Sequence, residues 1–181
     1  MGVQISGLSN LKRKLDSLPK YMNTAVRNAT YELTDSIQGE AQANLQSSIK
    51  YSSGELAGSV KTEVTTDNEG NIVGHVWSDK KQAIFREFGT GKVGQHSNKE
   101  LPPGVSPIYT QTVWFFPVAS TSDNLTQLYG IPTINIQGKE FYRTGGQPAH
   151  PWLYPALKNV SEYSDEVYAK HFRNELRKAI R

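Results

Sequence analysis

The stretch Gly89-Thr90-Gly91-Lys92 comes nearest in this chain to a phosphate-binding loop. Such a loop needs a glycine five residues before its Gly-Lys pair and a serine or threonine after the lysine, because backbone amides and a hydroxyl group hold the phosphates and magnesium. This chain has Arg86 and Val93 at those positions. We therefore expect a tight turn in which Gly89 and Gly91 supply backbone angles that other residues avoid.

The other reactive residue types also lack the spacing of a catalytic or metal site. No histidine is paired with another, or with a carboxylate, at ligand spacing. Ser59 lacks the flanking residues of a nucleophilic serine turn. Glu87 and Glu140 would act as a carboxylate pair only if the fold brought them together. We expect no enzymatic activity, no metal and no cofactor. The histidines are His75, His96, His150 and His171.

Glu87 has an unusual setting for a charged side chain. It lies between Phe85 and Phe88, directly before the double-glycine turn. Carboxylates are seldom buried unless they are paired. Two roles are open: Glu87 accepts hydrogen bonds from turn amides or an arginine of its own subunit, or it pairs with a basic group of a neighbouring subunit.

Composition indicates one soluble domain, residues 1–181, with a modest core. Of the 181 residues 36% are hydrophobic, and the net charge of +3 permits contact with nucleic acid without arguing strongly for it. Without cysteine the chain has no disulfide or thiolate metal site, which fits folding in a reducing cytoplasm. The most apolar run, residues 113–119, is far shorter than the roughly 20 residues that span a bilayer. We expect no membrane contact.

Helical spacing of apolar residues marks the N-terminal third. A short helix is predicted to end at Pro19, and a longer one follows it. Gly39, inside the longer helix, marks either a close approach by another backbone or an irregularity. Basic residues at 12–14 and 20 lie on the polar side. The first stripe consists of Leu8, Leu11, Leu15 and Leu18, and the second of Met22, Val26, Ala29, Leu33, Ile37, Ala41, Leu45 and Ile49.

The middle of the chain reads as β-structure. Alternation over 59–66 and 72–78, around the turn residues 67–71, predicts an antiparallel hairpin. Residues 92–144 form a proline-rich, β-rich insertion, which we interpret as an arm to an adjacent subunit or ring. In it we predict strands at 112–116 and 133–136, with residues 140–143 closing a second hairpin. Its candidate interface or local-core residues are Trp114, Phe115, Phe116, Tyr129, Phe141 and Tyr142.

A final helix is predicted from Trp152 to the end of the chain, with acidic residues early and basic residues late, as the helix dipole favours. Its apolar face consists of Val160, Tyr163, Val167, Tyr168, Phe172, Leu176 and Ile180. The fold class expected is α+β, with an antiparallel sheet packed against a long N-terminal helix and a C-terminal helix.

Three short blocks, residues 53–60, 85–91 and 145–157, resemble in order and spacing the neck or tail-completion family of long-tailed double-stranded DNA bacteriophages. The resemblance covers roughly residues 5–90 and 145–181 and leaves the insertion outside. In one departure, Tyr154 stands where the family often has arginine, which puts any charged contact there in doubt. The matching residues are Gly54, Leu56, Ser59, Glu87, Phe88, Gly89, Thr90, Gly91, Pro151, Trp152, Leu153, Pro155, Ala156 and Leu157.

The resemblance implies a structural virion protein, not an enzyme. Such a protein assembles in the host cytoplasm into a homo-oligomeric ring, completes the tail end and joins tail to head. Its partners are other neck and tail proteins, and DNA passes through the ring. Alternatives are a tail-terminator or head-closure (stopper) protein and, from another class, a DNA-binding accessory protein.

Overall fold

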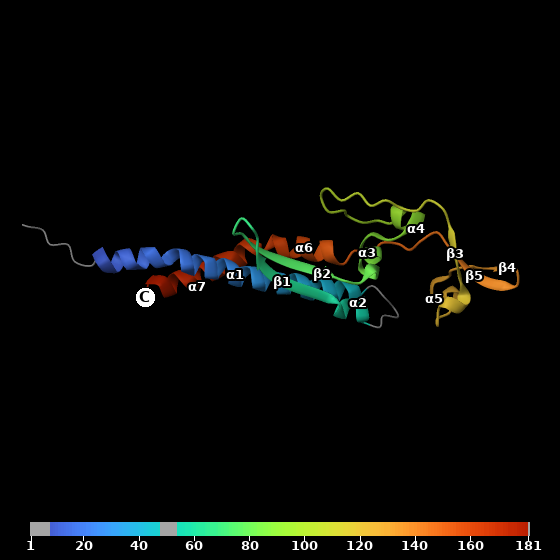
Figure 1. Cartoon of the computed structure of the whole chain (residues 1–181), viewed down its shortest axis with the longest axis horizontal. Helices are drawn as coiled ribbons and strands as arrows, with labels where there is room; N and C mark the ends of the chain where they lie inside the picture. The colour runs from blue at the N-terminus through green and yellow to red at the C-terminus, as the bar shows by residue number, and fades with distance from the viewer. Residues whose placement is uncertain (1–7, 48–53, 181) are drawn as a thin grey trace, which may run out of the picture. The chain divides into compact units, whose positions relative to one another are not determined.

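The computed structural model describes residues 8–47 and 54–180, whose helices and strands are labelled in Figure 1. The chain divides into two compact units. The first comprises the chain up to Asp79 together with the part from Pro155 onward, and the second comprises Lys80–Tyr154. The predicted insertion, residues 92–144, lies within the second unit, which extends beyond it at both ends.

The first unit is organised around α1, a helix that runs without interruption over Leu8–Ser47. The prediction that Pro19 ends a helix is therefore wrong. A proline inside a helix costs about 3 kcal/mol, but packing of α1 against α7 opposes this cost on both sides of Pro19. Lys14 donates to the Ile180 carbonyl of α7, and Ala25 is fully buried. The predicted stripe residue Ile49 lies outside the described residues.

The predicted hairpin is confirmed and packs on α1. Strand β1 (Val60–Thr66) pairs antiparallel with β2 (Ile72–Ser78). The Asp67 carboxylate fixes the turn, because its Oδ1 accepts from the amides of Glu69 and Asn71 at 2.9 and 2.8 Å. Before β1, α2 (Glu55–Gly58) forms one short helical turn.

Gly74 of β2 faces α1 so closely that a side chain would not fit. A Cβ there would lie 2.1 Å from Thr34 Oγ1 and 3.2 Å from Thr30 Cγ2, whereas one at Gly39 would meet nothing within 4 Å. Of the two readings of Gly39, the irregularity is the one that agrees with this open space.

These two glycines predict opposite effects of the same substitution. Gly74→Ala should lower the free energy of unfolding by about 1–3 kcal/mol, because buried Thr34 must move. Gly39→Ala should raise it by up to about 1 kcal/mol through helix propensity. Urea unfolding followed by far-ultraviolet circular dichroism measures both changes. Equal effects of the two substitutions would show that β2 does not approach α1 as closely as described.

The C-terminal helices complete the first unit. Helix α6 (Leu153–Glu162) and helix α7 (Ser164–Ile180) are separated at Tyr163, so the prediction of one unbroken helix is wrong in this detail. The core joins α1 to both helices, with Val160 and Val167 buried against Ala29 and Leu33. Glu32 of α1 accepts from Lys170 at 2.6 Å and contacts His171 at 2.8 Å. These hydrogen bonds, the one from Lys170 first, hold the pKa of Glu32 below its usual value.

The second unit contains a sheet with strand order β3–β5–β4, all neighbours antiparallel. Its strands are β3 (Trp114–Pro117), β4 (Thr133–Ile136) and β5 (Lys139–Thr144), which confirms the predicted second hairpin. Gln137 and Gly138, both with positive φ, form its turn. The other elements of this unit are α3 (Lys81–Phe88), α4 (Gly91–His96), η1 (Val118–Ser120) and α5 (Leu125–Tyr129). None of these helices was predicted from the sequence.

The fold is α+β, as expected: a long N-terminal helix, small antiparallel sheets and C-terminal helices. Among the described residues, no helix combines the length and the apolar character that crossing a membrane requires.

Candidate functional site: a glycine junction and a buried glutamate

Two of the three sequence blocks meet inside the second unit, where the turn after α3 lies against the segment before α6. We call this the glycine junction, and it consists of Gly89, Thr90, Gly91, Gly94, Gly145, Gly146 and Gln147. Thr90 N donates to Gln147 O at 2.9 Å, and Gln147 N donates back to Thr90 Oγ1 at 3.1 Å. Val93 N donates to Gly145 O at 3.3 Å. The two segments therefore join through their backbones.

Two positions of the junction require glycine, both because the backbone φ is positive and because another backbone lies too close for a side chain. Gly91 has φ +59°, and a Cβ on it would lie 2.1 Å from Gly145 O. Gly146 has φ +112°, and a Cβ on it would lie 1.8 Å from Thr90 O. Backbone atoms cannot move aside as a flexible side chain can, so larger residues are excluded from both positions.

The hydrogen bonds of the junction do not favour a phosphate loop. Such a loop needs free backbone amides pointing at the ligand, whereas the amides of Thr90, Val93 and Gly94 all donate to carbonyl groups of the protein. The tight turn predicted from the sequence is confirmed, with φ of 73° at Gly89 and 59° at Gly91.

Glu87 lies next to the junction, at the end of α3, and is only 7% exposed. Its Oε2 accepts from the amides of Trp152 and Leu153 at 2.6 and 2.9 Å, and its Oε1 accepts from Tyr154 N at 3.0 Å. A helix begins with amides that have no partner within the helix, and negative charge is favoured there. Pro155, next in the chain, has no amide hydrogen. Glu87 thus caps the start of α6, and of the two roles left open the structure shows the one within the subunit.

Trp152 fixes the same segment through its side chain. It is 3% exposed, and its Nε1 donates to Ala83 O of α3 at 3.0 Å. A phenylalanine at this position would fill similar space without this hydrogen bond. Glu87 and Trp152 together hold α3 to the segment that opens α6.

Two partly buried basic residues lie near Glu87. Arg86 precedes it in the chain, and His150 is bonded to Arg86. Burial lowers the pKa of the Arg86 guanidinium. Burial, together with the charge of Arg86, lowers the pKa of His150 below its usual 6.5. His150 N donates to Arg86 O at 2.8 Å, which keeps the two residues together.

The lowered pKa of His150 predicts that the protein becomes less stable as the pH falls into the mildly acidic range. The unfolded chain takes up a proton on His150 more readily than the folded protein does, so stability should be full above about pH 6.5 and fall below it. Thermal unfolding between about pH 7.5 and 5.5 measures the decline. His150→Gln should remove part of it. An unchanged decline in the variant would contradict the assignment.

The first sequence block lies in the other unit and has a local structural role. Gly54, with φ 74°, precedes α2. Ser59 Oγ donates to Leu56 O at 2.6 Å and lies 2.7 Å from Ser78 Oγ of β2. Ser59 therefore ties the end of α2 to the hairpin and is engaged in that role.

The remaining motif residues are mostly buried or half-buried, and Glu87 and Glu140 do not form a carboxylate pair. Ala156 is fully buried, Leu157 is exposed, and Phe88 and Pro151 are half-buried. Glu140 is an exposed residue of β5, whereas Glu87 uses its carboxylate on the amides that open α6. Among residues 8–47 and 54–180, no group of three or more histidine and acidic side chains is placed to hold a metal ion.

Strand register divides the predicted aromatic residues between the two faces of the sheet. Directly paired residues point to the same face, so Phe116 and Tyr142 share one face and Phe115, Phe141 and Ile134 the other. Tyr142 is 1% exposed and its ring centroid lies 5.2 Å from that of Phe116. As a core residue, Tyr142 is not available as an interface residue, and the local-core reading holds for this pair.

The face opposite Tyr142 is open and combines apolar with basic side chains, because exposed Arg143 pairs with Phe115 and exposed Lys139 pairs with Ile136. Phe115, Ile134 and Ile136 are 44%, 41% and 40% exposed, and Phe141 is half-buried beside them. We call these four residues the outer arm face. Sequence reasoning missed the two isoleucines, although the alternation Thr-Ile-Asn-Ile over 133–136 was a usable signal. The other two aromatics lie elsewhere: Tyr129 is exposed at the end of α5 and Trp114 lies beside Gly91.

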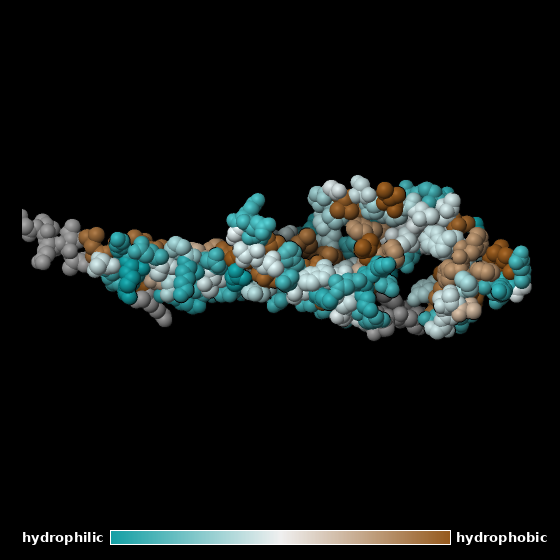
Figure 2. All heavy atoms as spheres, viewed as in Figure 1, coloured by the Kyte–Doolittle hydropathy of each residue, from teal (hydrophilic) through white to brown (hydrophobic). Residues whose placement is uncertain are grey.

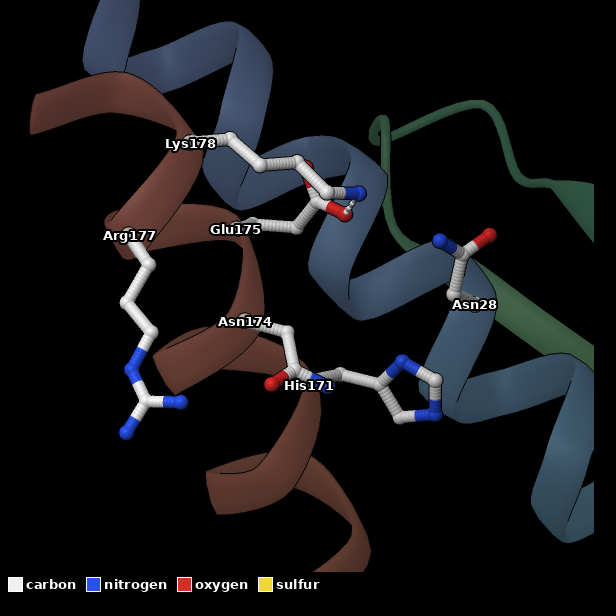
Figure 3. Close-up of a pocket in the computed structure, with 6 residues that line it drawn as sticks. All are labelled: Asn28, His171, Asn174, Glu175, Arg177 and Lys178. Atoms are coloured by element: carbon white, nitrogen blue, oxygen red, sulfur yellow. Dashed lines mark hydrogen bonds and ion pairs between the residues drawn. The ribbon is translucent and has the colours of Figure 1, made fainter. Parts of the chain in front are cut away.

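A pocket in the first unit is lined by Asn28 of α1 and by five residues of α7 (Figure 3). Glu175 is buried and pairs with Lys178 at 2.5 Å. Arg177 points away from α1 in Figure 3. The charged groups that line this pocket therefore do not converge on a common point.

Comparison with known proteins gave no match: no protein-family model matches the sequence, and no curated protein or solved structure was found to be similar.

Proposed function

We propose that this protein is a structural component of a bacteriophage neck, which completes the tail end and joins it to the head by ring assembly. The observation that carries the proposal is the outer arm face, four exposed or half-buried apolar side chains that share one sheet face with Arg143 and Lys139, on the segment already interpreted as an arm. Large apolar side chains grouped on an open face mark binding sites on soluble proteins.

The roles of the motif residues support a binding protein over an enzyme. Glu87 caps a helix, the junction glycines let two backbones meet, and Ser59 secures a turn. Each of these residues builds the subunit and leaves its polar atoms engaged. Their order along the chain is the order that resembles the neck or tail-completion family.

A ring requires two different surfaces on each subunit, because its contacts are head-to-tail and close by rotation. The outer arm face supplies one such surface, and brown atoms mark this end of the second unit in Figure 2. Aromatic and aliphatic side chains at the centre of a protein interface typically contribute most of its binding energy.

The proposal is tested by changing this face without changing the fold. The whole of residues 92–144 cannot simply be deleted, because Ser97 and Tyr109 bond to Ala149 and Phe88 around the junction. In the double variant Phe115→Thr/Ile134→Thr, each replacement keeps β-propensity. We expect the yield of joined particles in complemented infections to fall at least about tenfold.

The matched control is Glu140→Thr, an exposed β5 position on the opposite face of the sheet. It should leave particle yield unchanged. Wild-type yield from the double variant, with the variant protein folded and expressed, would contradict the proposal. Salt-dependent binding of duplex DNA by the isolated chain would favour the accessory-protein alternative.

A further inference from the structure

The first turns of α1 carry an apolar stripe that the described structure leaves open. Leu8, Leu11 and Leu15 are 60%, 57% and 54% exposed. Brown residues mark the start of α1, beside the grey terminal segment, in Figure 2. Leucines exposed singly are ordinary, but a row of them on one helix face indicates a contact surface.

This stripe is the open end of the seam on which α7 packs. Positions 8, 11, 15, 18, 22, 25 and 29 follow alternating steps of three and four residues, the a and d positions of a heptad repeat. Ala25 and Ala29, on this seam, are fully buried where α1 packs against α7 (Figure 1). The Ile180 carbonyl near the end of α7 accepts from Lys14, so the seam continues past the described part of α7.

The charges beside the stripe decide which partner fits it. Lys12 and Lys14 occupy the e and g positions on its two sides. If two copies of this chain paired antiparallel here, these lysines would face one another, and like charges oppose such pairing. Acidic side chains at e and g of a partner helix would instead form ion pairs across the seam, with Lys12 first, because Lys14 also donates to the Ile180 carbonyl.

We propose that α1 binds, over Leu8 to Leu15, an amphipathic helix of another protein that has apolar residues at a and d and Asp or Glu at e and g. Such a helix extends the packing that α7 begins. This surface is separate from the outer arm face, and the inference does not depend on the proposed function.

The test uses a synthetic helical peptide of about three heptads with leucine at a and d and glutamate at e and g. Its matched peptide carries lysine at e and g. Fluorescence anisotropy measures the binding of each to the full chain. We expect the glutamate peptide to bind at least about tenfold more tightly than the lysine peptide.

Protein variants locate the binding. Leu11→Gln/Leu15→Gln should abolish binding of the glutamate peptide while circular dichroism stays unchanged, since glutamine forms helices nearly as well as leucine. The matched control is Ile84→Gln, a 62% exposed residue of α3, which should bind normally. Equal binding of both peptides, or binding retained by the double leucine variant, would overturn the proposal.

Two further measurements distinguish the proposed acidic helix from two other occupants of the stripe, a second copy of this chain and a lipid surface. If the wild-type chain sediments as a dimer and the leucine variant as a monomer, the stripe pairs with a second copy. If wild-type chain binds vesicles of phosphatidylglycerol and the leucine variant does not, it binds a lipid surface. Either result would overturn the assignment to an acidic helix.

Discussion

Replacing Gly91 with alanine should destabilise the second unit by roughly 3–5 kcal/mol, the largest effect expected from any substitution considered. The new Cβ would lie 2.1 Å from Gly145 O at a backbone φ of +59°. The turn and the segment before α6 would have to separate, which breaks the hydrogen bond from Val93 to Gly145. Chemical denaturation followed by tryptophan fluorescence measures the loss.

A matched control separates the contact from the backbone conformation. Gly104 also has a positive φ, +77°, but a Cβ there would meet nothing within 4 Å. Gly104→Ala should therefore cost only about 1–2 kcal/mol, the strain of the left-handed conformation. If the two variants lose equal stability, the close approach at the junction is not what makes glycine necessary at position 91.

Replacing Glu87 with alanine should lower the free energy of unfolding by about 2–4 kcal/mol, because three amides at the start of α6 lose their acceptor. Glu87→Gln keeps one carbonyl oxygen but loses the charge, so its cost should be about half as large. Thermal and urea unfolding of both variants provide the comparison.

Glu140→Ala is the control for these variants, since Glu140 belongs to the same unit and is exposed. It should change stability by less than about 0.5 kcal/mol. A cost at Glu87 no greater than that at Glu140 would show that the buried carboxylate does not secure α6.

The parts of the fold that local sequence specifies could be predicted. Alternation over 72–78 and the dense turn residues after Thr66 predict the first hairpin, and Gly138 marks the second. The prediction at Pro19 is wrong because a distant contact outweighs the local signal. A proline normally ends a helix, but α1 continues through Pro19 because it packs against α7, more than a hundred residues later in the chain.

The candidate site could be predicted only in part. Glu87 between phenylalanines is unusual enough to indicate a buried carboxylate with a partner. The partner amides lie 65 to 67 residues later, and no local rule identifies them. The outer arm face likewise depends on register: pairing of β5 with both β3 and β4 decides that Phe115 and Ile134 share a side.

The proposed neck function is tested most directly by electron microscopy of the particles that a phage encoding this protein makes when the gene for the protein is silenced. The account predicts separate DNA-filled heads and tails of finished length, because the joint between them is missing. Normal, joined particles would contradict it.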